Sequence, residues 1–164
     1  MHRVILAAAL ILTACASAPP VVSYRDPAQQ IYSIAVFDPS RLTGTWRQVA
    51  DFTDTADCPA GAVRFAPIGP AMRIEGQLCL AGVPTPVAGS LTAAGPGRFT
   101  TTGVSDPLWV LWADTDLRTL VLGTPSGRFG LILNREATLP TDRLTAAREV
   151  LAWNGYDLAR LRVK

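Results

Sequence analysis

The sequence predicts an all-β domain followed by a single α-helix, and three observations carry this prediction. From Gly44 onward, short segments rich in β-branched and aromatic residues alternate with turn signals, about 8–12 residues apart. Beyond Pro140 the apolar spacing becomes helical. The chain has 164 residues, 49% of them hydrophobic and 17% charged, which suits one domain with a sizeable core.

Eight strands are expected, and each is bounded by glycine, proline or aspartate. The turn signals include 67–70, 94–97, 105–107 and 125–127. Strands at this spacing favour a barrel or a sandwich joined by hairpins. In chain order, the predicted strands are 44–52, 60–67, 71–79, 84–92, 96–103, 107–114, 118–124 and 127–135.

The helix is expected to begin near Thr141 and to end at Asn154 and Gly155, a C-cap pair. Its apolar residues recur at helical spacing, and residues 156–163 return as a short extended piece. The basic residues near this end are mixed with acidic ones, so a solvated surface is favoured over a nucleic-acid patch.

The N-terminus has the features of an export signal. A positive start precedes an apolar run over 4–12, which is too short to span a membrane. Leu12-Thr13-Ala14-Cys15 resembles the bacterial lipobox, which implies cleavage before Cys15 and its acylation. The alternative is an ordinary signal peptide cut at 16–18. Ala16 after the cysteine favours the outer membrane, with the domain facing the periplasm.

Three units are therefore expected along the chain. Residues 1–14 are a lipoprotein signal peptide, and residues 15–35, with several prolines and small residues, are a lipidated tether. The folded domain spans residues 36–164. Ile34 to Phe37 are expected to pack on its base.

Composition argues against several kinds of active site. The net charge of +2 gives no strong attraction for nucleic acid. The only histidine, His2, falls in the signal peptide, and the only lysine is Lys164. Since His and Lys are frequent catalytic bases, an enzyme is disfavoured, and we expect neither a metal site nor a cofactor.

Two cysteines remain after Cys15. In an oxidising compartment, Cys58 and Cys79 are expected to form a disulfide. The alternative is a free nucleophilic or redox thiol, and this is the only feature of the sequence that favours an enzyme. No CxxC motif is present, and no histidine is available to lower a thiol pKa.

Three motifs resemble those of lipocalins, in the right order. Gly44-Thr45-Trp46, preceded by Phe37-Asp38, resembles the first motif. The turn 114–118, with Asp116 and Arg118, resembles the second, and the segment 127–135, ending in Arg135, resembles the third. The likeness covers about residues 36–162, and the C-terminal part is similar to bacterial outer-membrane lipocalins.

The resemblance implies an eight-stranded antiparallel up-and-down β-barrel, open at one end, with one helix packed on it. It also implies that Trp46 lies at the closed end with Arg135 across its ring. Such a cup binds a small apolar ligand, which makes a fatty acid, a lysophospholipid or a similar molecule the expected partner.

The candidate ligand-binding residues are Gln48, Ala50 and Phe52, which share a strand face with Trp46 if alternation is regular, and Trp109 and Leu111 on a later strand. Bacterial members usually carry a glutamate where this chain has Gln48. The alternative function is a structural or interaction lipoprotein whose barrel is filled by its own side chains. The sequence predicts no oligomeric state.

Overall fold

The computed structural model describes residues 22–55, 58–102 and 106–164. The predicted signal peptide and the predicted lipid anchor, Cys15, lie outside the described residues. Within the described part of the chain, no helix is long and apolar enough to cross a membrane.

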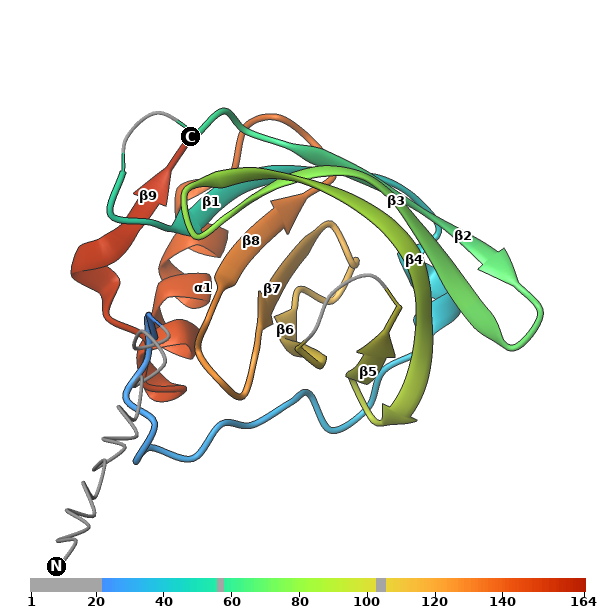
Figure 1. The fold of residues 1–164 in the computed structure, drawn as a ribbon, viewed down its shortest axis with the longest axis horizontal. Helices are drawn as coiled ribbons and strands as arrows, with labels where there is room; N and C mark the ends of the chain where they lie inside the picture. The colour runs from blue at the N-terminus through green and yellow to red at the C-terminus, as the bar shows by residue number, and fades with distance from the viewer. Residues whose placement is uncertain (1–21, 56–57, 103–105) are drawn as a thin grey trace, which may run out of the picture.

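The domain is a closed barrel of eight antiparallel strands, as expected (Figure 1). Each strand pairs with the next along the chain, and the eighth pairs back to the first. This up-and-down order lets short hairpins make most connections. The strands are β1 (Gly44–Phe52), β2 (Ala62–Ile68), β3 (Ala71–Leu80), β4 (Val83–Gly95), β5 (Arg98–Thr101), β6 (Leu108–Ala113), β7 (Thr119–Gly123) and β8 (Gly130–Asn134).

Strand β1 has irregular pairing that redirects its side chains. Its first residues pair with β2, and its register against β8 shifts between Gln48 and Ala50. A short strand, β9 (Leu161–Val163), pairs with the far end of β1. Strand β6 has a similar register shift between Val110 and Trp112. Since a bulge adds one residue to a strand, alternation does not continue through either site.

Helix α1 (Thr141–Trp153) packs on the outside of the barrel wall (Figure 1). Its buried residues Ala147 and Leu151 meet the outward side chains of Val121 on β7 and Ile132 on β8. The molecule therefore has two hydrophobic cores, one inside the barrel and one between the wall and the helix. A short 3-10 helix, η2 (Leu158–Arg160), leads into β9.

Residues 22–38, here called the N-terminal strap, pack along the domain (Figure 1). Tyr24 and Arg25 are buried. The Tyr24 amide donates to the Gly127 carbonyl at 2.7 Å, and the Arg25 guanidinium donates to the carbonyls of Pro125 at 2.9 Å and Asn154 at 3.0 Å. These bonds fasten the strap to the domain, although the sequence predicts a tether up to residue 35.

The strap leads to a 3-10 helix, η1 (Pro39–Leu42), before β1. Ile34 and Phe37 pack against the barrel core, as expected for the apolar run at 34–37.

Candidate functional site

The candidate site is the apolar interior of the barrel. Strands β2, β3 and β4 contribute alternate residues, and β7 and β8 contribute theirs from the wall that carries the helix. Among the described residues that line this cavity, none carries a charge. The lining consists of Phe65, Ile74, Leu78, Leu80, Val87, Leu91, Thr101, Thr102, Leu108, Leu122, Phe129, Leu131 and Leu133.

The interior is largely filled by its own side chains. They leave a cavity of about 30 Å³. A water molecule needs roughly 10–15 Å³ on this measure, so the space suits one or two waters and not an acyl chain. An apolar ligand could enter only if lining side chains changed rotamer.

The Gln48 side chain is buried, and its amide group bonds to backbone groups. Its Oε1 accepts the Cys79 amide at 2.7 Å and the Gly61 amide at 3.3 Å, and its Nε2 donates to the Cys79 carbonyl at 2.7 Å. The side chain thereby links β1 to the end of β3, which β2 does not bridge there. It is positioned to join the two strands, and it is not among the residues that line the cavity.

The other four candidate residues lie outside the barrel interior. Ala50, Phe52 and Leu111 belong to the core beneath helix α1, and Trp109 packs against that same core. The Arg98 guanidinium stacks on the Trp109 ring at 4.3 Å. The expectation that Ala50 and Phe52 share a face with Trp46 is wrong, because the bulge after Gln48 reverses the alternation.

Trp46 lies in the barrel core, and Arg135 covers its ring at 3.8 Å. The Trp46 indole N–H donates to the Leu42 carbonyl at 2.7 Å. Arg135 also donates to the Thr43 carbonyl at 3.0 Å, and burial lowers the pKa of its guanidinium. Gly44 has a φ of +109°, and a Cβ there would lie 2.9 Å from an Arg135 nitrogen, so the motif needs glycine.

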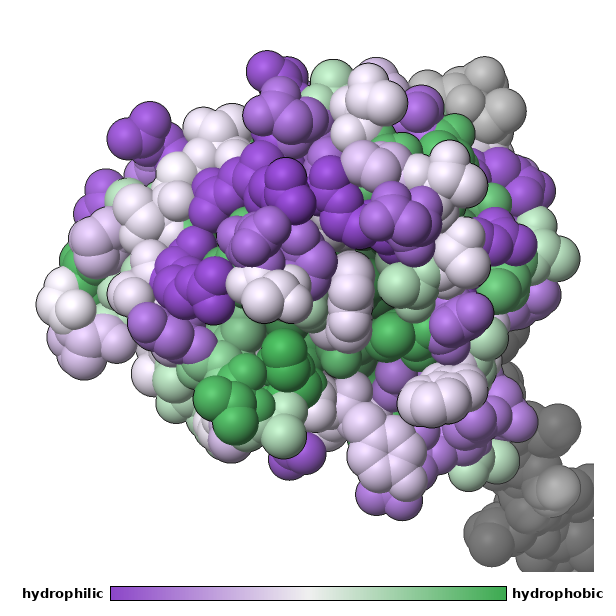
Figure 2. Space-filling view, turned by 180° about the vertical axis from the view of Figure 1, so that it is seen from behind, coloured by the Kyte–Doolittle hydropathy of each residue, from purple (hydrophilic) through white to green (hydrophobic). Residues whose placement is uncertain are grey.

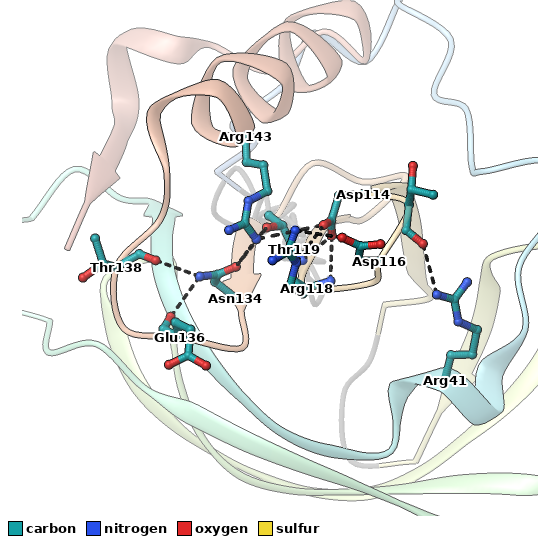
Figure 3. Close-up of polar contacts among 10 residues, drawn as sticks. Arg41, Asp114, Asp116, Arg118, Thr119, Asn134, Glu136, Thr138 and Arg143 are labelled. Atoms are coloured by element: carbon teal, nitrogen blue, oxygen red, sulfur yellow. Dashed lines mark hydrogen bonds and ion pairs between the residues drawn. The ribbon is translucent and has the colours of Figure 1, made fainter.

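The β6–β7 turn is held by its own polar residues (Figure 3). The Asp114 carboxylate accepts the Arg118 amide at 2.7 Å and the Thr119 amide at 2.5 Å. Arg118 pairs with Asp116 at 2.8 Å. Arg143 of helix α1 donates to the Thr119 hydroxyl at 2.9 Å. Asp116 and Arg118 therefore stabilise a turn and do not face the cavity.

A disulfide and an ion pair fasten the β1–β2 connection. Cys58 and Cys79 are bonded, as predicted, which leaves neither thiol free as a nucleophile. The Lys164 ammonium donates to the Cys58 carbonyl at 2.9 Å and lies 2.7 Å from the Asp51 carboxylate. Burial raises the pKa of Asp51, and Lys164 opposes that shift.

The candidate residues from the sequence do not include the residues that line the cavity, although the sequence identifies part of that lining. In β2 and β3, apolar Phe65, Ile74 and Leu78 alternate with polar Arg73 and Glu75, and this pattern identifies the inward face. In β7 and β8 all residues are buried, because the helix covers the outer face. Alternation cannot separate inward from outward residues there.

Comparisons with known proteins agree with this architecture. Residues 95–164 match the family model of the lipocalin-like domain. Lobster apocrustacyanin A1 is 15% identical, with a TM-score of 0.58 over 77% of this chain and 78% of that one. The siderocalin Ex-FABP, described as having dual ligand specificities, is 12% identical, with a TM-score of 0.60 over 75% of this chain and 93% of that one. Among curated proteins, none matches the sequence.

Proposed function

From the match of residues 95–164 to the lipocalin-like domain model and from the barrel fold, we propose that the chain is a lipocalin-like protein whose barrel binds a small hydrophobic molecule. The single observation that carries the proposal is the cavity lined by apolar side chains, with only the Thr101 and Thr102 side chains adding polar groups. Thr102 Oγ1 already accepts the Ser90 amide at 2.9 Å. The ligand is therefore apolar where it is buried, and any polar head stays outside the barrel.

A fatty acid, a lysophospholipid or a similar molecule fits this chemistry. Each buried methylene contributes about 0.8 kcal/mol. Rearranging a packed core costs roughly 1–3 kcal/mol, so a chain that buries several methylenes offsets that cost. The protein then acts as a carrier or store, and the disulfide removes the free thiol on which an enzymatic function would depend.

We also propose that the chain is anchored through an acylated Cys15 to the outer membrane, with the domain in the periplasm. The lipobox-like sequence supports this placement. Replacing Cys15 by serine is expected to move the protein from the membrane fraction to the soluble fraction. An unchanged distribution contradicts the anchor.

The second candidate is an interaction lipoprotein with a self-filled barrel, and the cavity of about 30 Å³ favours it. Native mass spectrometry after exposure to bacterial membrane lipids separates the two candidates. A stoichiometric adduct supports ligand binding. The self-filled barrel gains support if the protein stays bare while a lipid-binding lipocalin run beside it takes up lipid.

Filling the cavity provides a matched test of where an adduct sits. Val87→Phe adds volume to the lining, whereas Val83→Phe adds the same volume at an exposed position. Loss of the adduct in the first variant only, with both variants folded, places the ligand in the barrel.

A further inference from the structure

We propose that the outer side of the N-terminal strap, together with Trp153, lies on the surface of the phospholipid bilayer that carries the anchor. This inference rests on the proposed anchoring through Cys15. It specifies which face of the domain contacts the lipid, and it implies that the barrel is held close to the membrane and not at the end of a long tether.

The length of chain between anchor and fold restricts the orientation of the domain. Val22 lies seven residues after Cys15, so the chain between these two residues can span about 25 Å at most. The strap is bonded to the domain from its first residues, because the Tyr24 amide donates to the Gly127 carbonyl and the Asp26 amide donates to the Gly155 carbonyl. A domain of this size is roughly 35–40 Å across, so the side that carries the strap must stay close to the bilayer.

The strap presents an uncharged surface to that bilayer. No charged residue occurs from Pro27 to Phe37. Arg25, just before this stretch, is buried and donates to main-chain carbonyls. The stretch therefore carries no charge that would resist partial burial at an interface.

Exposed aromatic and aliphatic side chains gather on the strap and beside it. Trp153 is 80% exposed, Val36 86% and Tyr32 58%. The Tyr32 amide donates to the Asn154 side chain at 2.7 Å, and the Gln29 side chain donates to the Trp153 carbonyl at 2.9 Å, so the strap is fastened to the end of helix α1. Tryptophan and tyrosine prefer the membrane–water interface, where an apolar ring and a polar group are both accommodated.

The strap and a hydrophobic patch both lie in the lower part of the molecule, as Figures 1 and 2 show. The strap runs along the lower edge of the molecule in Figure 1. Figure 2, turned about the vertical axis, shows a hydrophobic patch in the lower part of the molecule and hydrophilic residues gathered above it. Ala35, Val36 and Pro96 line a shallow depression on the strap side.

Brominated lipids provide the test, because bromine quenches tryptophan emission only at short range. The full lipidated chain is reconstituted in vesicles of phosphatidylethanolamine and phosphatidylglycerol, with and without bromine on the acyl chains. The chain has four tryptophans, so quenching of Trp153 is expected to remove about a quarter of the emission. Trp153→Phe is expected to abolish most of that loss.

A matched control moves the reporter to the side of the molecule away from the strap. Trp153→Phe combined with Val163→Trp places a tryptophan at an exposed position at the end of β9, next to the C-terminus at the upper edge of Figure 1. This variant is expected to show no quenching by the brominated lipid.

The outcomes separate this proposal from the anchor itself. Flotation of the vesicles comes first, and a chain that does not float contradicts the anchor and with it the surface. A chain that floats with Trp153 unquenched, or with the Val163→Trp reporter equally quenched, overturns the surface alone. If Trp153 is not quenched and crosslinking joins two chains near Trp153, the surface binds a second copy of the chain and the proposal of a lipid contact is overturned.

Discussion

At the scale of single residues, the polar side chains buried in this barrel hold the backbone in place. Gln48 supplies the hydrogen bonds that no neighbouring strand gives to Cys79. Arg135 donates hydrogen bonds to the carbonyls of Thr43 and Arg41, and its guanidinium covers the Trp46 ring. Gln48 is a candidate ligand-binding residue in the sequence, whereas Arg135 is expected there to cover Trp46, and in the fold both side chains bond to the backbone.

Gln48→Leu is expected to destabilise the protein, because it leaves the buried amide and carbonyl of Cys79 without partners. An unsatisfied buried group costs about 1–3 kcal/mol, and urea unfolding monitored by tryptophan emission measures the difference. Arg47→Ala, at the exposed neighbour on the same strand, is the control. Equal midpoints for the two variants would contradict the role assigned to Gln48.

Asp51 predicts a pH dependence of stability. Burial raises the pKa of this carboxyl group in the folded state, so the folded protein binds its proton more tightly than the unfolded chain. Its contribution to the free energy of unfolding is therefore present below its ordinary pKa and is lost as the pH rises through the raised value. Asp51→Asn is expected to flatten this fall in urea titrations across acidic to neutral pH.

Asp54 is the control with the opposite sign. Hydrogen bonds from Arg160 lower the pKa of the exposed Asp54 carboxyl group. Its contribution is lost as the pH falls, so Asp54→Asn is expected to remove a dependence on the acid side only. If both variants changed the profile in the same direction, the assignment to Asp51 would fail.

At the scale of elements, most strands and the helix could be predicted, and the strap could not. The turn residues punctuate the strands, and the helix at Thr141–Trp153 lies where its spacing indicates. Residues 22–35 resemble a linker by composition, since Tyr24 and Arg25 are the two of them that are buried and several of their other contacts are made by main-chain groups. A bulge likewise leaves no mark on the sequence, which is why the inward face of β1 was misassigned.

Arg25→Ala is expected to release the strap while leaving the barrel folded. The substitution removes the guanidinium bonds to the carbonyls of Pro125 and Asn154. Hydrogen exchange is the measurement. Faster exchange is expected at the Tyr24 amide, which donates to the Gly127 carbonyl, and at the Asp157 amide, which donates to the Tyr24 carbonyl. Arg25→Lys keeps the charge but not the fork of donors, so partial release is expected. Unchanged exchange in both variants would show that Arg25 does not fasten the strap.

The disulfide is expected to contribute about 3 kcal/mol, because it closes a loop of 21 residues. Replacing both Cys58 and Cys79 by alanine is expected to lower the free energy of unfolding by that amount, which urea unfolding measures as a lower midpoint. A thiol titration of the unfolded wild-type chain checks the premise, and two reactive sulfhydryls there would refute it.

At the scale of the whole molecule, the two cores separate stability from the candidate site. The outer core fastens helix, strap and β9 to the barrel, while the inner core encloses the cavity. Neighbouring residues on one strand serve different cores: Leu122 lines the cavity and Val121 lies beneath the helix. Because both are apolar and buried, this division became visible only with the fold.

Leu122→Ala is expected to lower stability by about 2–5 kcal/mol and to enlarge the cavity. If the barrel takes apolar ligands, the variant should bind the fluorescent probe N-phenyl-1-naphthylamine more tightly than the wild type. Val121→Ala is the control, since it removes volume from the outer core. An equal gain in both variants would place the probe outside the barrel.

The contact between Lys164 and Asp51 also makes this chain a selective target for amine chemistry. Lys164 is the single lysine, and its ammonium is held by a carboxylate and a carbonyl. Acylation of this side chain by an N-hydroxysuccinimide ester requires its nitrogen to leave the Asp51 carboxylate and the Cys58 carbonyl. The rate of that labelling therefore reports how often the C-terminal side chain releases these two contacts.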